Sequence, residues 1–246
     1  RNRHYLAQST VVVVAGNLAK DSLAQKIEDC FSGIKVGPKD GKVKILESQT
    51  GPQLLLRTKK SDQTHIILGA RAYDTFNPKK YALQVLADIL GGGMSSRLFQ
   101  SVREKLGAAY YIKAQPDLYT DHGYLGVSAG IDHHKIESVI GAILDEFRRL
   151  KAEMVSDEEL QRAKDHLTGG FVLGLEGTDA LASFYGGQEI LEKEMLTPEE
   201  VAQKIQVVSA SEIQDAANEI FTNDKLNLAI ISPLEDKAQL ENILKL

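Results

Sequence analysis

The chain has 246 residues, of which 43% are hydrophobic and 26% charged, and its formal net charge is -5. These proportions are ordinary for a globular protein, and the length suits one large domain or one domain with part of another. Lysines and arginines are spread along the acidic chain, which gives no reason to expect a nucleic-acid-binding surface. No apolar run approaches the roughly 20 residues that a membrane span needs.

Cys30 is the single cysteine of the chain. One cysteine excludes an internal disulfide framework and a cysteine zinc cluster. Because Ile27 and Phe31 are its neighbours at helical spacing, we expect a buried structural thiol.

The first residues read as one strand and one helix. The run Val11–Val14 ends at Gly16-Asn17, which predicts a strand buried on both faces and then a turn. Leu23, Ile27 and Phe31 recur at helical spacing and predict a helix over 21–31. A β-α unit therefore opens the chain.

Residues 32–50 are rich in glycine and lysine and form the best candidate for a linker. Because the chain enters the valine strand within a few residues of Arg1, we expect it to be a piece of a longer protein. Residues 1–47 are then the tail end of a preceding domain plus a linker, and residues 48–246 form the C-terminal domain.

After the linker, pairs of strands are separated by a pair of helices, and helices fill most of the remainder. Strands are expected over 53–57, 65–72, 109–114, 123–131 and 226–231, and helices over 78–90, 95–105, 134–150, 156–173, 179–193 and 210–221, with a short helix at the end. Ser156, followed by three acidic residues, is a strong helix N-cap. Tight turns between adjacent strands predict an α+β fold: an antiparallel sheet with helices packed on one face, preceded by the β-α fragment.

Residues 90–110 carry a distinctive pattern, L-G-G-G-M-S-S-R-L-F-Q-S-V-R-E-K-L-G-A-A-Y. It resembles the second-half signature of the pitrilysin/insulinase family of zinc peptidases. Ser156 to Gly169 is similar to the family's S-x-E-E-L-x-x-A-K helix. Arg3-His4-Tyr5 with Val11 to Gly16 looks like the strand and turn that close the family's first half. The resemblance covers nearly the whole chain and implies the C-terminal domain, which does not bind zinc.

Arg103 and Tyr110 are the candidate substrate-binding residues. Arg103 is expected near a helix end and Tyr110 at the start of the next strand, and Gly107 allows the chain to fold back between them. A guanidinium and a phenol can donate hydrogen bonds to a peptide carbonyl and to its oxyanion. Taken alone, the residues favour a surface ion pair for Arg103 and a core position for Tyr110. The resemblance instead implies that both act on a substrate bound at a zinc elsewhere, and that Arg97 is structural or lies at an interface.

Gly91, Gly92 and Gly93 let the backbone turn sharply between two helices. They are read either as a plain helix break or as a hinge or substrate-contacting loop. A phosphate-binding loop is not expected, because the G-x-x-x-x-G-K-[ST] pattern and a preceding strand are both absent from the sequence.

Zinc peptidases of this family use an H-x-x-E-H helix, in which two histidines four residues apart reach one metal. None of the six histidines fits the pattern; the nearest approach, from His134 through Glu137, ends in Ser138. A solvated polar helix end is expected for Asp132, His133, His134 and Glu137, and an adventitious metal at this helix start is the alternative. No G-x-S-x-G elbow is present either. We expect no catalytic residue, metal ligand or cofactor in this chain, and zinc in the parent protein or a partner.

Three hypotheses follow. The chain is the C-terminal substrate-binding portion of a zinc endopeptidase, inactive alone, whose missing N-terminal half carries the zinc. Or it is a partner subunit that supplies Arg103 and Tyr110 to a separate zinc-bearing protein. Or it is a non-catalytic structural subunit that resembles respiratory-complex core proteins. The expected partners are a peptide substrate and the zinc-bearing half or subunit, in a dimer, without nucleic acid and without a membrane span.

Overall fold

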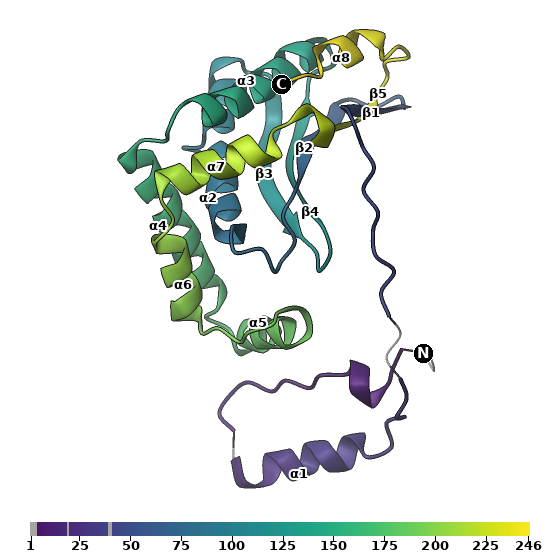
Figure 1. Cartoon of the computed structure of the whole chain (residues 1–246), viewed down its shortest axis with the longest axis vertical. Coiled ribbons are helices and arrows are strands. Elements are labelled where there is room, and N and C mark those ends of the chain that lie inside the picture. Colours follow the sequence, from purple (N-terminus) through teal and green to yellow (C-terminus); the bar gives the residue numbers. More distant parts are fainter. Residues whose placement is uncertain (1–3, 19, 39–40) are drawn as a thin grey trace. The chain divides into compact units, whose positions relative to one another are not determined.

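The computed structural model describes residues 4–18, 20–38 and 41–246 and divides the chain into two units (Figure 1). Unit 1 comprises Arg1–Ile45 with Gly170–Pro198, and unit 2 comprises Leu46–Gly169 with Glu199–Leu246. The expected domain division between residues 47 and 48 stays a prediction.

Unit 1 contains helices and extended chain. A short 3-10 turn, Ala7–Ser9, precedes α1 (Lys20–Phe31), and the end of α4 (Asp157–Gly174) leads to α5 (Thr178–Leu191). The helix predicted over 21–31 is therefore confirmed.

Two expectations about unit 1 are wrong. Val11–Val14 form no strand, because a strand needs a partner for its backbone hydrogen bonds and no strand lies in the described part of this unit. Val12 is 41% exposed, where burial on both faces was expected. Cys30 is also exposed, since no sheet lies in these residues for the apolar side of α1 to cover.

Unit 2 is built on a five-stranded sheet in the order β1-β5-β2-β4-β3. The strands are β1 (Gln53–Thr58), β2 (Thr64–Ala72), β3 (Ala109–Leu118), β4 (Gly123–Ile131) and β5 (Leu226–Ser232). Neighbouring strands are antiparallel except β1 and β5, which run parallel. The predicted α+β class is confirmed, and the sheet is mixed through that one parallel pair.

Helices cover one face of this sheet, as predicted (Figure 1). They are α2 (Lys80–Gly91), α3 (Ile136–Ala152) and α7 (Ala210–Ile220), with α8 (Ala238–Ile243) against α3. The remaining helical pieces are α4 as far as Gly169, α6 (Pro198–Gln206), the π-helix η2 (Phe99–Lys105) and the 3-10 turns His133–Lys135 and Asn223–Lys225. Helix α6 was not predicted, although Pro198 and the two glutamates that follow it are typical of a helix start. No helix in the described ranges is long and apolar enough to cross a bilayer.

Strand alternation places the core between sheet and helices. In β2, Ile66 and Leu68 are buried under the helices while Ile67 is 53% exposed. Phe147 of α3 and Phe221, just after α7, stack with ring centroids 4.0 Å apart in this layer. The core is therefore one layer deep, and it supports the helix–strand junction that carries the candidate site.

Candidate functional site

The S-S-R-L-F segment begins a helical stretch that runs from Arg97 to Lys105, most of it as π-helix η2. Leu98 and Val102 are completely buried and anchor it to the core. The amide of Leu106 donates to the carbonyl of Ser101, 3.2 Å away, which is the i to i−5 bond of a π-turn. Such turns are rare and occur frequently at functional sites.

Arg103 lies in the last turn of this stretch, on the side away from the core. Its guanidinium carbon is 5.0 Å from the centroid of the Phe99 ring, a favourable cation–π arrangement. No carboxylate pairs with Arg103 in the part of the chain that the structure describes, contrary to the surface ion pair that its sequence context favours. Among the residues that the structure describes, no partner occupies its donors, so a ligand can bind them.

Gly107 reverses the chain after the π-helix, as the sequence predicts. Its φ of +53° lies in the left-handed region that favours glycine. The amide of Ala108 then donates to the carbonyl of Val102 at 3.1 Å. Lys135 Nζ donates to the carbonyl oxygens of Leu106 (3.0 Å) and Gly107 (3.3 Å), which fixes the reversal.

Tyr110 follows in β3 and is 60% exposed. The register between β3 and β4 pairs Ala109 with Ile131 and Tyr111 with Gly130, so Tyr110 is the extra residue of a β-bulge. Bulges turn a side chain away from its regular direction and are common beside active sites. The core position that the residues alone favour for Tyr110 is therefore wrong.

Tyr111, the neighbour of Tyr110, has contacts on the surface of the sheet. Its ring lies over Gly130, where an added Cβ would come within 2.5 Å of it. Its hydroxyl is 3.2 Å from Nδ1 of His65. Thus Tyr111 contacts His65 and Gly130 on the sheet surface, whereas the hydroxyl of Tyr110 has no hydrogen-bond partner among the described residues.

The structure places Arg103 and Tyr110 at the two ends of the Gly107 reversal. No hydrogen bond or ring contact joins the two side chains within the described residues. Both are exposed, so a ligand can reach either of them, and their role as a substrate-binding pair stays a prediction.

Gly91 ends α2 and is buried against β3. A Cβ on Gly91 would lie 2.4 Å from the backbone nitrogen of Ala114, so the close approach of α2 to β3 requires glycine here. A Cβ on Gly93 would be 3.5 Å or more from its neighbours, an ordinary distance. The triplet thus contains a packing residue at one end, and its role as a hinge or substrate-contacting loop stays a prediction.

Arg97 has a structural environment, in line with its expected role. Its Nε and Nη2 donate to the two carboxylate oxygens of Glu159 in α4, at 2.8 and 2.7 Å. Its Nη1 is 3.8 Å from Glu146 Oε2 in α3. The hydrogen bonds to Glu159 raise the pKa of the Arg97 guanidinium. The S-S-R-L-F and S-x-E-E-L patterns therefore meet in one ion-pair network.

Asp88 and His166 form a pair that the sequence did not indicate. Oδ1 of Asp88 in α2 is 2.8 Å from Nδ1 of His166 in α4. Burial raises the pKa of Asp88, although the bond to His166 opposes the shift. The pair links the end of α2, next to the glycine triplet, with α4, and nothing in its spacing of 78 residues signals this contact.

The helix start at 132–137 is not a metal site. His133 is occupied by Thr64 (2.7 Å) and by the carbonyl of Ser61 (2.9 Å), and Asp132 caps the amide of His134. Across the described ranges, no group of three or more histidine, cysteine, aspartate or glutamate side chains is arranged to hold a metal ion. The described residues therefore do not fit the zinc that the family resemblance implies.

Known proteins are similar to this chain along nearly its whole length. It is 31% identical over 230 residues to the uncharacterized zinc protease YmxG of Bacillus subtilis, covering 94% of this chain and 55% of YmxG. It is 33% identical over 233 residues to an uncharacterized zinc protease of Rickettsia felis, again covering 94% of this chain and 55% of the relative. The chain thus spans about half the length of the curated relatives it matches.

Solved structures share the fold. A protease from Helicobacter pylori superposes with a TM-score of 0.80 at 19% identity, over 89% of this chain and 54% of its own. A chain of complex III2 from Candida albicans superposes with a TM-score of 0.78 at 19% identity, over 94% of this chain and 57% of its own.

The profile of the peptidase M16 inactive domain matches residues 1–167, which include the glycine triplet, Arg103, Tyr110 and the Arg97–Glu159 pair. A solved peptidase M16 inactive domain from Pseudomonas fluorescens also superposes with a TM-score of 0.78 at 20% identity, over 89% of this chain and 53% of its own. Because the family model matches more than half of its residues, the chain belongs to the peptidase M16 inactive domain family.

Proposed function

We propose that this chain is the substrate-binding C-terminal portion of a zinc-dependent endopeptidase. The relatives named zinc proteases are about twice as long as the matched region, which leaves room for a zinc-bearing part outside it. Because the residues here do not fit zinc, the metal belongs to that part or to a partner subunit. The role of this chain is then to hold and orient a peptide.

The exposure of Arg103 and Tyr110 on either side of the Gly107 reversal is the observation that carries this proposal. Arg103 offers a planar set of charged donors, and Tyr110 offers one hydroxyl donor. Both can donate hydrogen bonds to a peptide carbonyl oxygen, and these hydrogen bonds become stronger as that oxygen acquires negative charge. Neither side chain would have to leave another polar partner within the described residues.

Substitution of these two residues tests the proposal in the native protein, isolated with any preceding segment and partner subunits. We expect Arg103→Ala to lower kcat/KM for an internally quenched peptide by about 10- to 100-fold, because a hydrogen bond to a charged group is lost. Tyr110→Phe should lower it by about 3- to 10-fold, because one neutral donor is lost.

Two neighbours serve as matched controls. Lys105→Ala removes an exposed cation from the same turn, and Tyr111→Phe removes a phenol one residue away. Both variants should retain near-normal kcat/KM. Unchanged kinetics in Arg103→Ala and Tyr110→Phe would refute the assignment.

A structural subunit without peptidase activity is the second candidate. It is favoured by the fold likeness to a chain of complex III2, which at 19% identity concerns the fold alone. On this reading the native assembly forms tightly but hydrolyses no peptide, and neither Arg103→Ala nor Tyr110→Phe has a measurable consequence.

A further inference from the structure

The position of Arg103 depends on the short helical stretch from Arg97 to Lys105. The Arg103 side chain lies over the Phe99 ring of the same stretch, with 5.0 Å between its guanidinium carbon and the ring centroid. Leu98 and Val102 anchor the stretch in the core through apolar contacts, which have no preferred direction. Directional bonds hold its two ends: Lys135 bonds to the carbonyls of Leu106 and Gly107 after the last turn, and Arg97 forms bonds at the start.

Arg97 supplies directional bonds at the start of the stretch. Its paired bonds to Glu159 have the planar, two-point geometry that a guanidinium forms with a carboxylate. The Arg97 side chain is 13% exposed, so the pair is shielded from solvent far more than a surface ion pair. The carbonyl of Arg97 also accepts a bond from Ser101 Oγ at 2.8 Å, which ties the first turn to the π-turn.

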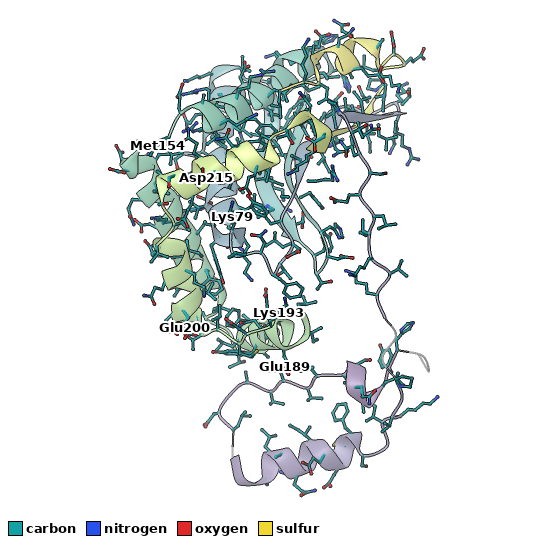
Figure 2. All side chains as sticks on the ribbon, in the orientation of Figure 1. Lys79, Met154, Glu189, Lys193, Glu200 and Asp215 are labelled. Carbon is teal, nitrogen blue, oxygen red and sulfur yellow. The ribbon has the colours of Figure 1, made fainter. Side chains whose placement is uncertain are left out.

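Glu146 adds a third element to the network. Its side chain is 8% exposed, and Arg149 donates to its Oε1 at 3.0 Å. Its Oε2 and Nη1 of Arg97 are both buried without a hydrogen-bond partner among the described residues, and they face each other at 3.8 Å. Glu146 in α3 and Glu159 in α4 thus converge on one guanidinium. Figure 2 labels Met154, which lies in the segment that joins these two helices.

The two carboxylates make the arrangement sensitive to the loss of the cation. Without the charge on Arg97, two acidic groups with low exposure would face each other, and like charges at low exposure repel strongly. The helix start would then shift to let water reach them. Because the stretch is short, such a shift carries through to its last turn, where Arg103 lies.

We propose that Arg97 and Glu159 are positioning residues that set the location of Arg103 for its peptide ligand. The proposal rests on the proposed function for the identity of the ligand. The mechanical part, that the Arg97–Glu159 pair determines the surroundings of Arg103, concerns this chain alone.

The mechanical part is tested by NMR on the 246-residue chain with ¹⁵N-labelled arginine. The Arg103 Nε–H resonance is assigned from its loss in Arg103→Lys. Glu159→Gln, which keeps the size of the side chain and removes its charge, should shift this resonance. Arg162→Ala, which removes an exposed partner of Glu158 in the same helix, should leave it in place. An Arg103 resonance that does not move in Glu159→Gln would overturn the proposal.

The functional part is tested by kinetics in the native peptidase. Glu159→Gln and Arg97→Met should lower kcat/KM by about 10- to 100-fold, as small displacements of positioned groups do. The loss should divide between kcat and KM in the same way as for Arg103→Ala. In the double variant Arg97→Met with Arg103→Ala, the loss should not exceed that of Arg103→Ala alone, because both act through one group. Arg97→Lys, which keeps the charge, should recover part of the activity if Arg97→Met is unstable.

The outcomes separate the two proposals. If Arg103→Ala leaves kcat/KM unchanged, the proposed function fails. The shift of the Arg103 resonance in Glu159→Gln still tests whether the Arg97–Glu159 pair positions Arg103. If Arg103→Ala lowers kcat/KM but the losses in the double variant multiply, the positioning proposal fails and the proposed function stands.

Discussion

The glycines at the end of α2 show how one residue type meets different requirements. Gly91 is needed because the backbone of β3 lies where its Cβ would be. At Gly92 an added Cβ would lie 2.0 Å from the Asp88 carboxylate and 2.7 Å from the backbone Cα of Asp88. At Gly93 an added Cβ would lie 3.5 Å from the His166 ring, an ordinary contact distance. The packing requirement therefore falls on the first two positions.

We predict that Gly91→Ala lowers the free energy of unfolding by about 1–3 kcal/mol, the usual cost of forcing an extra methyl group into a packed site. Gly141→Ala is the matched control: it lies within α3, and nothing is within 4 Å of its added Cβ. There alanine should stabilise the protein by about 0.5–1 kcal/mol through its better helix propensity. Urea unfolding measures both, and a Gly91→Ala variant as stable as the parent would contradict the packing argument.

Residue-level predictions from the sequence succeed where the decisive contacts are local. Gly107 was expected to reverse the chain, and its positive φ does so within one turn. The local sequence favours burial of Cys30 and Tyr110, but both are exposed, because burial depends on elements far away in the sequence. The bonds between Arg97 and Glu159 span 62 residues, so no local pattern could indicate them.

At the scale of elements, local capping signals define several helix starts. Ser209 and Glu212 form a reciprocal capping box at α7: the amide of Glu212 donates to Ser209 Oγ, and the amide of Ser209 donates to Glu212 Oε2 at 2.8 Å. Ser156 likewise accepts from the amide of Glu159 at 3.2 Å, as the sequence predicts. By contrast, the strand expected at Val11–Val14 could not form from its own residues, because strands are completed by partners.

The capping box predicts a pH dependence. Hydrogen bonds from the backbone and side chain of Ser209 lower the pKa of Glu212 below its ordinary value of 4.5. Since the pKa is lower in the folded state, the stabilising contribution is present above 4.5 and is lost as the pH falls through the lower folded value. We therefore expect parent and Glu212→Gln unfolding free energies to differ at pH 6 and to converge toward pH 3.

The control for this prediction is Ser209→Ala, which removes the N-cap side chain. Its loss should lower the free energy of unfolding by about 1 kcal/mol at every pH in that range, in addition to the pH-dependent loss of the Glu212 contribution. Glutamine can still accept the amide bond, so Glu212→Gln isolates the effect of the charge. A parent–Glu212→Gln difference that grows as the pH falls would show that the sign is wrong.

At the scale of the whole molecule, the described core lies within unit 2. Every residue of the core cluster, from Ile66 to Leu244, falls within 46–169 or 199–246. The sheet order brings β1 beside β5, so the two ends of unit 2 close on each other through a parallel pair. These are the properties of a domain that folds without help from the residues before it.

We therefore predict that a variant comprising residues 46–246 unfolds cooperatively and keeps the urea midpoint of the 246-residue chain. The reason is that its core cluster and all five strands are complete. Leu86→Ala in α2, where the side chain is completely buried, is the comparison: the cavity should cost about 2–5 kcal/mol in either form. If removal of residues 1–45 destabilised the protein as much as that cavity, the first residues would be an integral part of the fold, and the expected domain division near residue 47 would have to be given up.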